Sequence, residues 1–228
     1  SAMQRALRTH EVHNRMHGYE MHVARRSILD DTWTKPAFIL SVLLQELAKP
    51  EGEGAEWLFW VDADTIILNP YVPIEVFLPP AGGWDDVHML VTSDWNGLNN
   101  GVFPIRVCQW SVELLSSILS YRVYRPQADL QFRDQSAMDA LLKEERFSSH
   151  VLHVPQRWFN AYYGDVDGKI ETYQIRRGEF LVHFPGLPNR DQLMQPWLER
   201  AEKHAPDWEL ELVHTTYPEE VKKYWRKK

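Results

Sequence analysis

The sequence predicts an α/β sandwich with a mostly parallel central sheet. Apolar segments of strand length alternate along the chain with segments of helical pattern, which is the order that parallel sheets require. In addition, residues 57–61 form a continuous apolar run, Trp-Leu-Phe-Trp-Val, as expected of a central strand buried on both faces.

The expected elements follow in chain order. Residues 4–16 are helical and polar in pattern, and residues 19–24 form a short strand. A helix over residues 37–47 is apolar almost all round and is therefore expected to be buried; Pro36 stands in its first turn, where proline is tolerated. The strand at 57–61 resumes at 65–68 after a polar interruption. Further strands are expected at 88–92, 101–106, 151–154 and 179–184, and further helices at 109–120, 135–143 and 190–204.

Length and composition limit the class of protein. The 228 residues have 44% hydrophobic and 12% aromatic side chains, enough for one packed core and against wholesale disorder. The 25 Lys and Arg against 32 Asp and Glu give a net charge of −7, which disfavours a nucleic-acid partner. No apolar stretch approaches the roughly 20 residues that cross a bilayer. The single cysteine, Cys108, excludes an internal disulfide.

No linker is long enough to divide the chain, so residues 4–228 are expected to form a single domain. Residues 1–3 read like a protease-cleavage scar, which implies that the natural protein extends upstream. The basic residues at 222–228 are interpreted as a solvated terminus.

The most informative motif is Asp62-Ala63-Asp64, which follows the predicted buried strand. In an extended chain these two carboxylates point the same way, and a divalent cation relieves their repulsion. The carboxyl end of a strand in an α/β sheet is also where ligands usually bind. Two chemistries fit: a metal held against the diphosphate of a nucleotide sugar, or a haloacid-dehalogenase-type phosphatase with Asp62 as nucleophile and Asp64 as general acid/base.

The phosphatase hypothesis has the weaker context. Such enzymes need a later lysine and a second acidic pair at a strand end. Here residues 164–168, Gly-Asp-Val-Asp-Gly, have the pattern of a turn, and Lys169 stands where the second acid is wanted.

Three later segments carry further candidates. Residues 94–101 form a polar loop with two glycines, suited to close approach of a ligand and to hydrogen bonds with sugar hydroxyls. Asp134 opens a helix, where by itself it is better explained as an N-cap. His183 ends an apolar strand, a place that suits a metal ligand as well as a structural histidine.

Together these segments resemble glycosyltransferase family 34, which includes fungal α-mannosyl- and α-galactosyltransferases and plant xyloglucan α-xylosyltransferases. The resemblance runs from about residue 16 almost to the C-terminus. An Asp-X-Asp motif alone is unspecific, whereas several motifs in the same order are specific. The others are Trp33-Thr34-Lys35, Cys108-Gln109-Trp110-Ser111, Arg133-Asp134-Gln135-Ser136-Ala137, Pro155-Gln156-Arg157-Trp158-Phe159-Asn160 and Leu181-Val182-His183-Phe184-Pro185-Gly186.

The resemblance implies a GT-A fold, a metal-dependent nucleotide-sugar donor, and transfer of a hexose or pentose with retention of α configuration. Asp62, Asp64 and His183 would be the ligands of Mn²⁺, with Mg²⁺ as the alternative; an imidazole among oxygen ligands favours Mn²⁺. Asp134 and Gln135 would lie at the reacting carbon as catalytic residues. The residues expected to bind donor and acceptor are Asp62, Asp94, Asn99, Asn100, Gly101, Gln156, Asn160 and Gly186.

The same resemblance gives the expected partners: a UDP- or GDP-linked sugar as donor, and an oligosaccharide or polysaccharide as acceptor. It also implies the Golgi lumen and, in the full-length protein, a type II membrane anchor. A GT-A domain normally opens with a strand before its first helix, and nothing before residue 4 can form one. That departure leaves open a truncated or inactive transferase-like domain that only binds glycans, and it exposes a sheet edge that permits a homodimer.

Overall fold

The structure is a computed structural model that describes residues 1–228, and it divides into two compact units. Unit 1 comprises residues 1–21, 61–80 and 154–228, and unit 2 comprises residues 22–60 and 81–153. Each unit has a sheet and a hydrophobic core of its own. No helix is both long and apolar enough to cross a bilayer.

Unit 2 is built on a five-stranded sheet. Its strand order is β1 (Trp57–Val61), β5 (Val102–Arg106), β3 (Met89–Asp94) and β4 (Gly97–Asn99), and β6 (Val151–His153) also pairs with β3. β3 runs antiparallel to β4 and β5 and parallel to β6, so the sheet is mixed.

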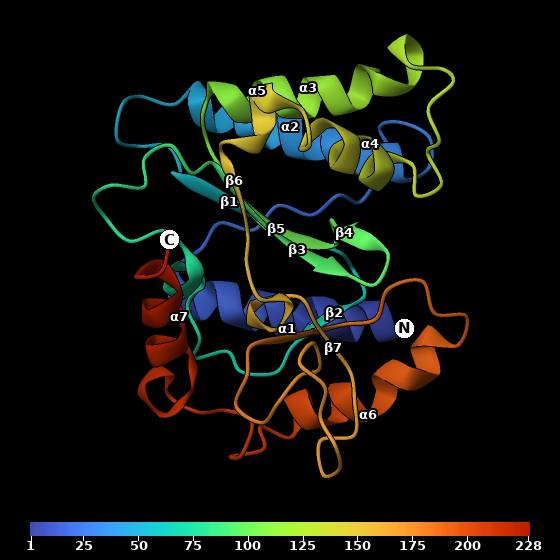
Figure 1. Cartoon of the computed structure of the whole chain (residues 1–228). Coiled ribbons are helices and arrows are strands. Elements are labelled where there is room, and N and C mark those ends of the chain that lie inside the picture. The colour runs from blue at the N-terminus through green and yellow to red at the C-terminus, as the bar shows by residue number, and fades with distance from the viewer. The chain divides into compact units, whose positions relative to one another are not determined.

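The helices of unit 2 lie along one side of this sheet, as Figure 1 shows. They enclose a core in which Leu43, Phe103 and Leu114 are completely buried. The helices are η1 (Asp31–Trp33), α2 (Thr34–Leu47), α3 (Gln109–Tyr124), α4 (Asp134–Leu141) and α5 (Glu145–Ser148).

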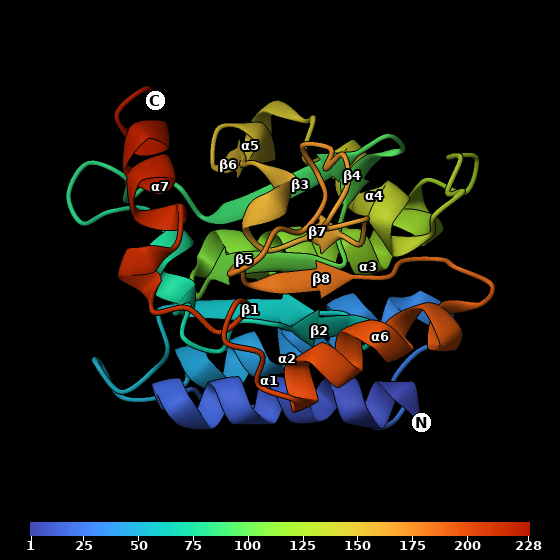
Figure 2. The ribbon, with the colours of Figure 1, turned by 90° about the horizontal axis from the view of Figure 1, so that it is seen from below.

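Unit 1 has a three-stranded sheet in the order β2 (Thr65–Ile67), β8 (Leu181–His183) and β7 (Ala161–Tyr162). β8 runs antiparallel to β2 and parallel to β7. Two helices, α1 (Ala2–His17) and α6 (Arg190–Glu202), pack along β2 (Figure 2). The remaining helices are η2 (Ile74–Phe77), η3 (Gln156–Trp158), η4 (Leu212–His214) and α7 (Tyr217–Trp225).

The start of α1 shows how local sequence sets an element. Ser1 caps the helix, because its hydroxyl accepts from Gln4 N while the Gln4 side chain reaches back to the Ser1 amine. The helix ends at Gly18, which adopts the left-handed conformation (φ 73°) that favours glycine. Its buried face includes Ala2 and Ala6, which pack into the core of unit 1.

The α/β class is confirmed, and most predicted elements are present within a few residues, but four details differ. Residues 19–24 form no strand. The strand β1 is half-buried rather than buried on both faces. The helix α2 exposes Leu44 and Leu47, so only one side of it is covered. The predicted basic terminus contains the end of α7, whose Val221 and Trp225 are buried.

Candidate functional site

The strongest cluster of metal-ligating side chains lies in unit 1. Asp62, Asp64 and His183 each offer one ligand atom, and these atoms all lie within 4.8 Å of one another. Strand pairing brings them together: Asp62 and Asp64 directly precede β2, and His183 ends β8 in register with Thr65. The backbone oxygen of Asp64 also accepts from Phe184 N at 3.0 Å. From the sequence, His183 was expected beside Asp62 and Asp64 only because of the family resemblance. The strand pairing in unit 1 brings the three residues together in space.

The protonation of His183 is set by Asn160. Its Nδ1 lies 2.7 Å from Asn160 Oδ1, an acceptor, so Nδ1 carries the proton and donates. The other nitrogen, Nε2, is then left with a lone pair; it is buried, makes no hydrogen bond, and lies 3.3 Å from Asp64 Oδ1. A lone pair and a carboxylate oxygen repel each other at this distance unless a cation attracts both.

These observations fit a divalent cation. Two carboxylates and a neutral imidazole whose other nitrogen is hydrogen-bonded form a common donor set for first-row metals. The three residues therefore offer ligand atoms of the kind that the family resemblance implies, and the buried Nε2 of His183 has no hydrogen-bond partner.

Arg190 is an unexpected neighbour of this cluster. It is the first residue of α6, and its Nη1 donates to Asp64 Oδ2 at 2.8 Å. Burial by itself raises the pKa of the Asp64 carboxyl, but the pKa lies below its usual range because positive charge and hydrogen-bond donors, Arg190 among them, face the carboxylate. Asp64 is therefore held ionised, as a metal ligand must be.

A second hydrogen-bonded group lies in unit 2 and contains six of the predicted site residues. At its centre, Asn100 Nδ2 donates to Asp134 Oδ2 at 2.8 Å, and Asn100 N donates to Gln135 Oε1 at 3.1 Å. Asn100 and Asp134 are both buried. The two expected catalytic residues at the start of α4 are thus bound to the segment that follows β4.

The remaining predicted site residues of unit 2 form hydrogen bonds within the β3–β4 hairpin and the turn after it. Asp94 Oδ2 accepts from Asn99 Nδ2 at 3.1 Å, and Asp94 Oδ1 accepts from Asn96 N at 2.7 Å. Asn99 Oδ1 in turn accepts from Gly101 N at 3.0 Å. The polar loop expected at 94–101 is therefore an ordered hairpin followed by a turn.

The other predicted residues lie in unit 1. Asn160 is completely buried and bonds His183, and Gln156 Nε2 donates to the backbone oxygen of Asn160 at 3.1 Å. Both residues therefore support the position of His183. Gly186 lies in the loop after β8 with φ 64°, a conformation that side chains rarely adopt.

No site role was predicted from the sequence for two cationic residues, Lys35 and Arg190. In unit 2, Lys35 Nζ donates to the backbone oxygen and to Oδ1 of Asn100, both at 3.1 Å. Lys35 stands in the first turn of α2 and Arg190 opens α6, although a positive charge is unfavourable at a helix N-terminus. That mismatch between charge and helix end is the signal that singles them out.

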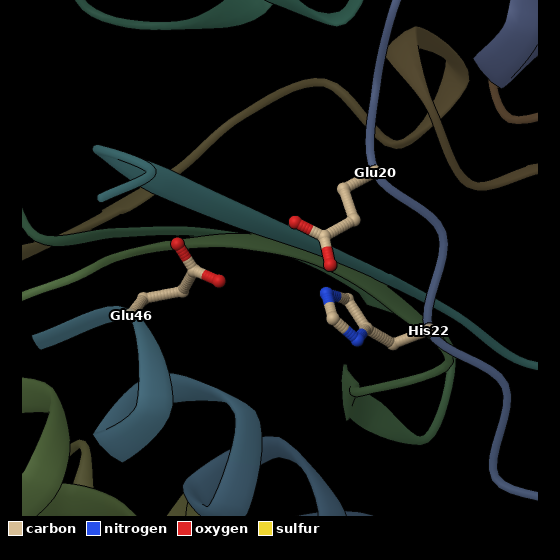
Figure 3. A group of neighbouring side chains, drawn as sticks. All are labelled: Glu20, His22 and Glu46. Carbon is tan, nitrogen blue, oxygen red and sulfur yellow. The ribbon is translucent and has the colours of Figure 1, made fainter. Parts of the chain in front are cut away.

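A second group of metal-ligating residue types carries no site. Figure 3 shows Glu20 and His22 on one extended segment and Glu46 near the end of α2. The buried Glu46 carboxylate already accepts from Lys49 Nζ at 2.7 Å and from Ala55 N at 2.9 Å. These bonds close the turn after α2 and account for the presence of Glu46.

The fold belongs to the GT-A-like α/β class. The fold is similar to that of a solved glycosyltransferase involved in the glycosylation of the major capsid of PBCV-1. The TM-score is 0.57 at 16% identity, over 86% of this chain and 92% of that one.

Residues 82–193 match the galactosyl transferase GMA12/MNN10 family, so this part of the chain belongs to that family, glycosyltransferase family 34. The matched segment contains Asp134, Asn160, His183 and Arg190 and begins after Asp62 and Asp64. The resemblance stated from the motifs is confirmed.

Curated relatives extend the similarity beyond that segment. A probable glycosyltransferase 4 of Oryza sativa is 33% identical in an alignment of 214 positions that covers 80% of this chain and 41% of that protein. Xyloglucan 6-xylosyltransferase 4 of Arabidopsis thaliana is 28% identical over 75% of this chain and 39% of its own length. A probable α-1,2-galactosyltransferase of Schizosaccharomyces pombe is 24% identical over 77% and 60%. The chain thus spans about two fifths of the length of the plant relatives it matches.

Proposed function

We propose that the protein is a metal-dependent, retaining glycosyltransferase that moves a sugar from a nucleotide sugar to a glycan with α linkage. The observation that carries the proposal is the cluster of Asp62, Asp64 and His183 in a chain with this family match. Its metal is Mn²⁺, with Mg²⁺ as the alternative, because one ligand is an imidazole.

The residues of unit 1 hold the ion and keep its ligands in the required state. Asp62 and Asp64 provide carboxylate oxygens, and His183 provides Nε2 because Asn160 holds the proton on Nδ1. When bound, the ion neutralises negative charge that develops on the leaving diphosphate.

The residues of unit 2 act on the sugar. As the bond at the anomeric carbon breaks, positive charge develops on the ring, and a carboxylate held on one face stabilises it. We assign this role to Asp134, with Gln135 beside it. The bond from Asn100 fixes the direction of the Asp134 carboxylate before substrate arrives, which is how preorganised groups lower a barrier.

The donor is a UDP- or GDP-linked hexose or pentose, with galactosyl or mannosyl transfer as the leading assignments, and the acceptor is an oligosaccharide or polysaccharide. The site of action proposed by resemblance is the Golgi lumen, with a type II anchor in the full-length protein. A phosphatase is not favoured, because Asp165 and Asp167 lie in a loop and Asp167 is paired with Arg177.

The test is isothermal titration of UDP, GDP and their sugars in Mn²⁺ and again in EDTA. We expect one nucleotide to bind only with the metal, and Asp64→Asn to abolish this binding. Asp167→Asn is the matched control, because Asp167 is an acid of the same unit outside the cluster. If an acceptor is then found, the anomeric proton coupling of the product reports whether α configuration is retained.

A well-folded wild-type protein that binds no nucleotide in Mn²⁺ would contradict the proposal and favour an inactive, glycan-binding domain. Metal-dependent hydrolysis of p-nitrophenyl phosphate, lost in Asp62→Asn, would instead favour the phosphatase.

A further inference from the structure

The tip of the β3–β4 hairpin exposes an indole. Trp95 and Asn96 form the two-residue turn, since Asp94 pairs with Gly97 across the hairpin. The side chain of Trp95 is 70% exposed, although an indole is among the most favourable groups to bury. An exposed indole in unit 2, in the hairpin that leads to the proposed catalytic segment, offers a flat apolar surface to a ligand.

The turn that carries Trp95 is held rigidly. Both carboxylate oxygens of Asp94 are engaged, one by Asn96 N and the other by Asn99 Nδ2. Gly97 closes the turn at φ 98°, a conformation that favours glycine. A fixed platform loses little conformational entropy when a ligand stacks on it.

The hairpin is continuous with the proposed reaction site. Asn99, which bonds Asp94, also accepts from Gly101 N, and the intervening Asn100 bonds Asp134 and Gln135. This path of hydrogen bonds connects the hairpin that carries Trp95 to the two assigned catalytic residues within unit 2.

The surroundings of Trp95 fit a sugar better than a protein. Within residues 89–99 it is the one exposed large apolar side chain, and its neighbours Ser93, Asn96 and Gly97 are small or polar. A tryptophan buries at most about 250 Å², far below the roughly 1,000 Å² of a specific protein interface. One flat apolar ring among amides and hydroxyls matches one pyranose, which has a C–H face and a polar rim.

We propose that Trp95 is a stacking subsite for the glycan acceptor, binding one of its sugar rings on the indole face. This inference rests on the proposed function, since it names how that site holds its acceptor. Asp94 is accordingly also a positioning residue, because its carboxylate fixes the turn.

The experiment is isothermal titration of the full chain with two probes: cellohexaose, whose β-linked units present flat C–H faces, and α-1,6-linked mannotetraose. Against the probe that binds, Trp95→Ala is expected to weaken affinity about tenfold. Trp95→Tyr, which keeps a flat ring, should restore most of the affinity, whereas Trp95→Leu, apolar but not flat, should behave like alanine.

Tyr124→Ala is the matched control, because Tyr124 is also a largely exposed aromatic residue (80%), at the end of α3. Thermal unfolding of all variants should be unchanged, since the side chain at the turn is exposed. Mn²⁺-dependent nucleotide binding should also be unchanged in Trp95→Ala, which separates a subsite from general damage.

Three results would overturn the subsite: wild-type protein that binds neither probe at millimolar concentration, Trp95→Ala that binds as wild type does, or full affinity in Trp95→Leu. A fourth such result would come from sedimentation velocity, if Trp95→Ala abolished self-association of the protein while glycan binding stayed intact. If no variant binds nucleotide while glycan binding still depends on Trp95, the subsite stands and the transferase proposal fails.

Discussion

The hydrogen bond between His183 and Asn160 is the single-residue feature on which metal binding depends. Asn160→Leu removes the acceptor for Nδ1, so the ring loses its fixed tautomer and orientation. We expect Mn²⁺ affinity to fall about 10- to 100-fold, the usual cost of losing such a partner. Asn160→Asp keeps an acceptor at the same place and should retain or increase the affinity. Titration of Mn²⁺ monitored by electron paramagnetic resonance checks this, and equal affinity in the Leu and Asp variants would contradict it.

His10 makes stability depend on pH. Burial in unit 1 lowers its pKa from 6.5 to about 4, despite the contact of Nε2 with Thr65 O. In the unfolded chain His10 therefore binds a proton below about pH 6.5, whereas in the folded chain it does so only below about pH 4. Stability should fall as the pH falls through this window, by up to about 1.4 kcal/mol per pH unit from this group.

Urea unfolding between neutral pH and about pH 5 measures this slope. His10→Gln should lose that part of the slope, whereas the exposed His214→Gln should keep it. Other titrating groups contribute equally to all three proteins, so an unchanged slope in His10→Gln would mean that His10 is not buried in its neutral form.

Individual site residues were predictable where the chemistry is local to the chain. Two aspartates two residues apart after an apolar strand are visible in the sequence, and this pair lies at the cluster. The partners of that pair were not visible from local pattern: the β2–β8 pairing brings His183 to Asp64 from more than a hundred residues away. No site role was predicted for Arg190 and Lys35 for the same reason, because their partners Asp64 and Asn100 are distant in the sequence.

At the scale of elements, the start of α4 is strained. Arg133, just before Asp134, adopts φ 52° and ψ −116°, which strongly favours glycine, and it pairs with Asp31, itself at φ 51°. Arg133→Gly and Arg133→Ala both lose that ion pair, so their difference isolates the backbone strain. The glycine variant should have a free energy of unfolding about 1 kcal/mol higher than the alanine variant, although alanine is usually the more stabilising residue of the two. Urea unfolding of the two variants measures the difference, and an alanine variant of equal or greater stability would show that the strain is absent.

Elements were predictable where apolar periodicity was strong. The strands β1, β3, β5 and β8 were all found from apolar runs, because buried strands need them. The hairpin strand β4 was read as a loop because Gly97-Leu98-Asn99 has no strand pattern, and it pairs only since Asp94 and Gly97 close a turn. The helix α7 was not predicted, because its lysines gave the segment the pattern of a solvated terminus. They lie on the exposed side of the helix, and the buried residues are Tyr217, Val221 and Trp225.

At the scale of the whole molecule, the absence of a linker predicts that the two compact units behave as one domain. The chain passes between the units four times, after residues 21, 60, 80 and 153, so neither unit is a separable stretch of sequence. Because each unit is assembled from separate segments of the chain, neither unit can fold until the segments of the other unit that connect them are in place. We therefore expect unit 1 and unit 2 to unfold in one cooperative transition.

Two matched core substitutions test this expectation. Leu43 in unit 2 and Leu198 in unit 1 are both completely buried, and each Leu→Ala change should cost about 2–5 kcal/mol. If the units are cooperative, hydrogen exchange by mass spectrometry will show that either substitution speeds global exchange in α3 and in α6 alike. If Leu43→Ala speeds exchange in α3 and leaves α6 protected, the single-domain prediction is wrong. The cause would then lie in the two separate cores, which would supply each unit with enough buried apolar surface to stay folded alone.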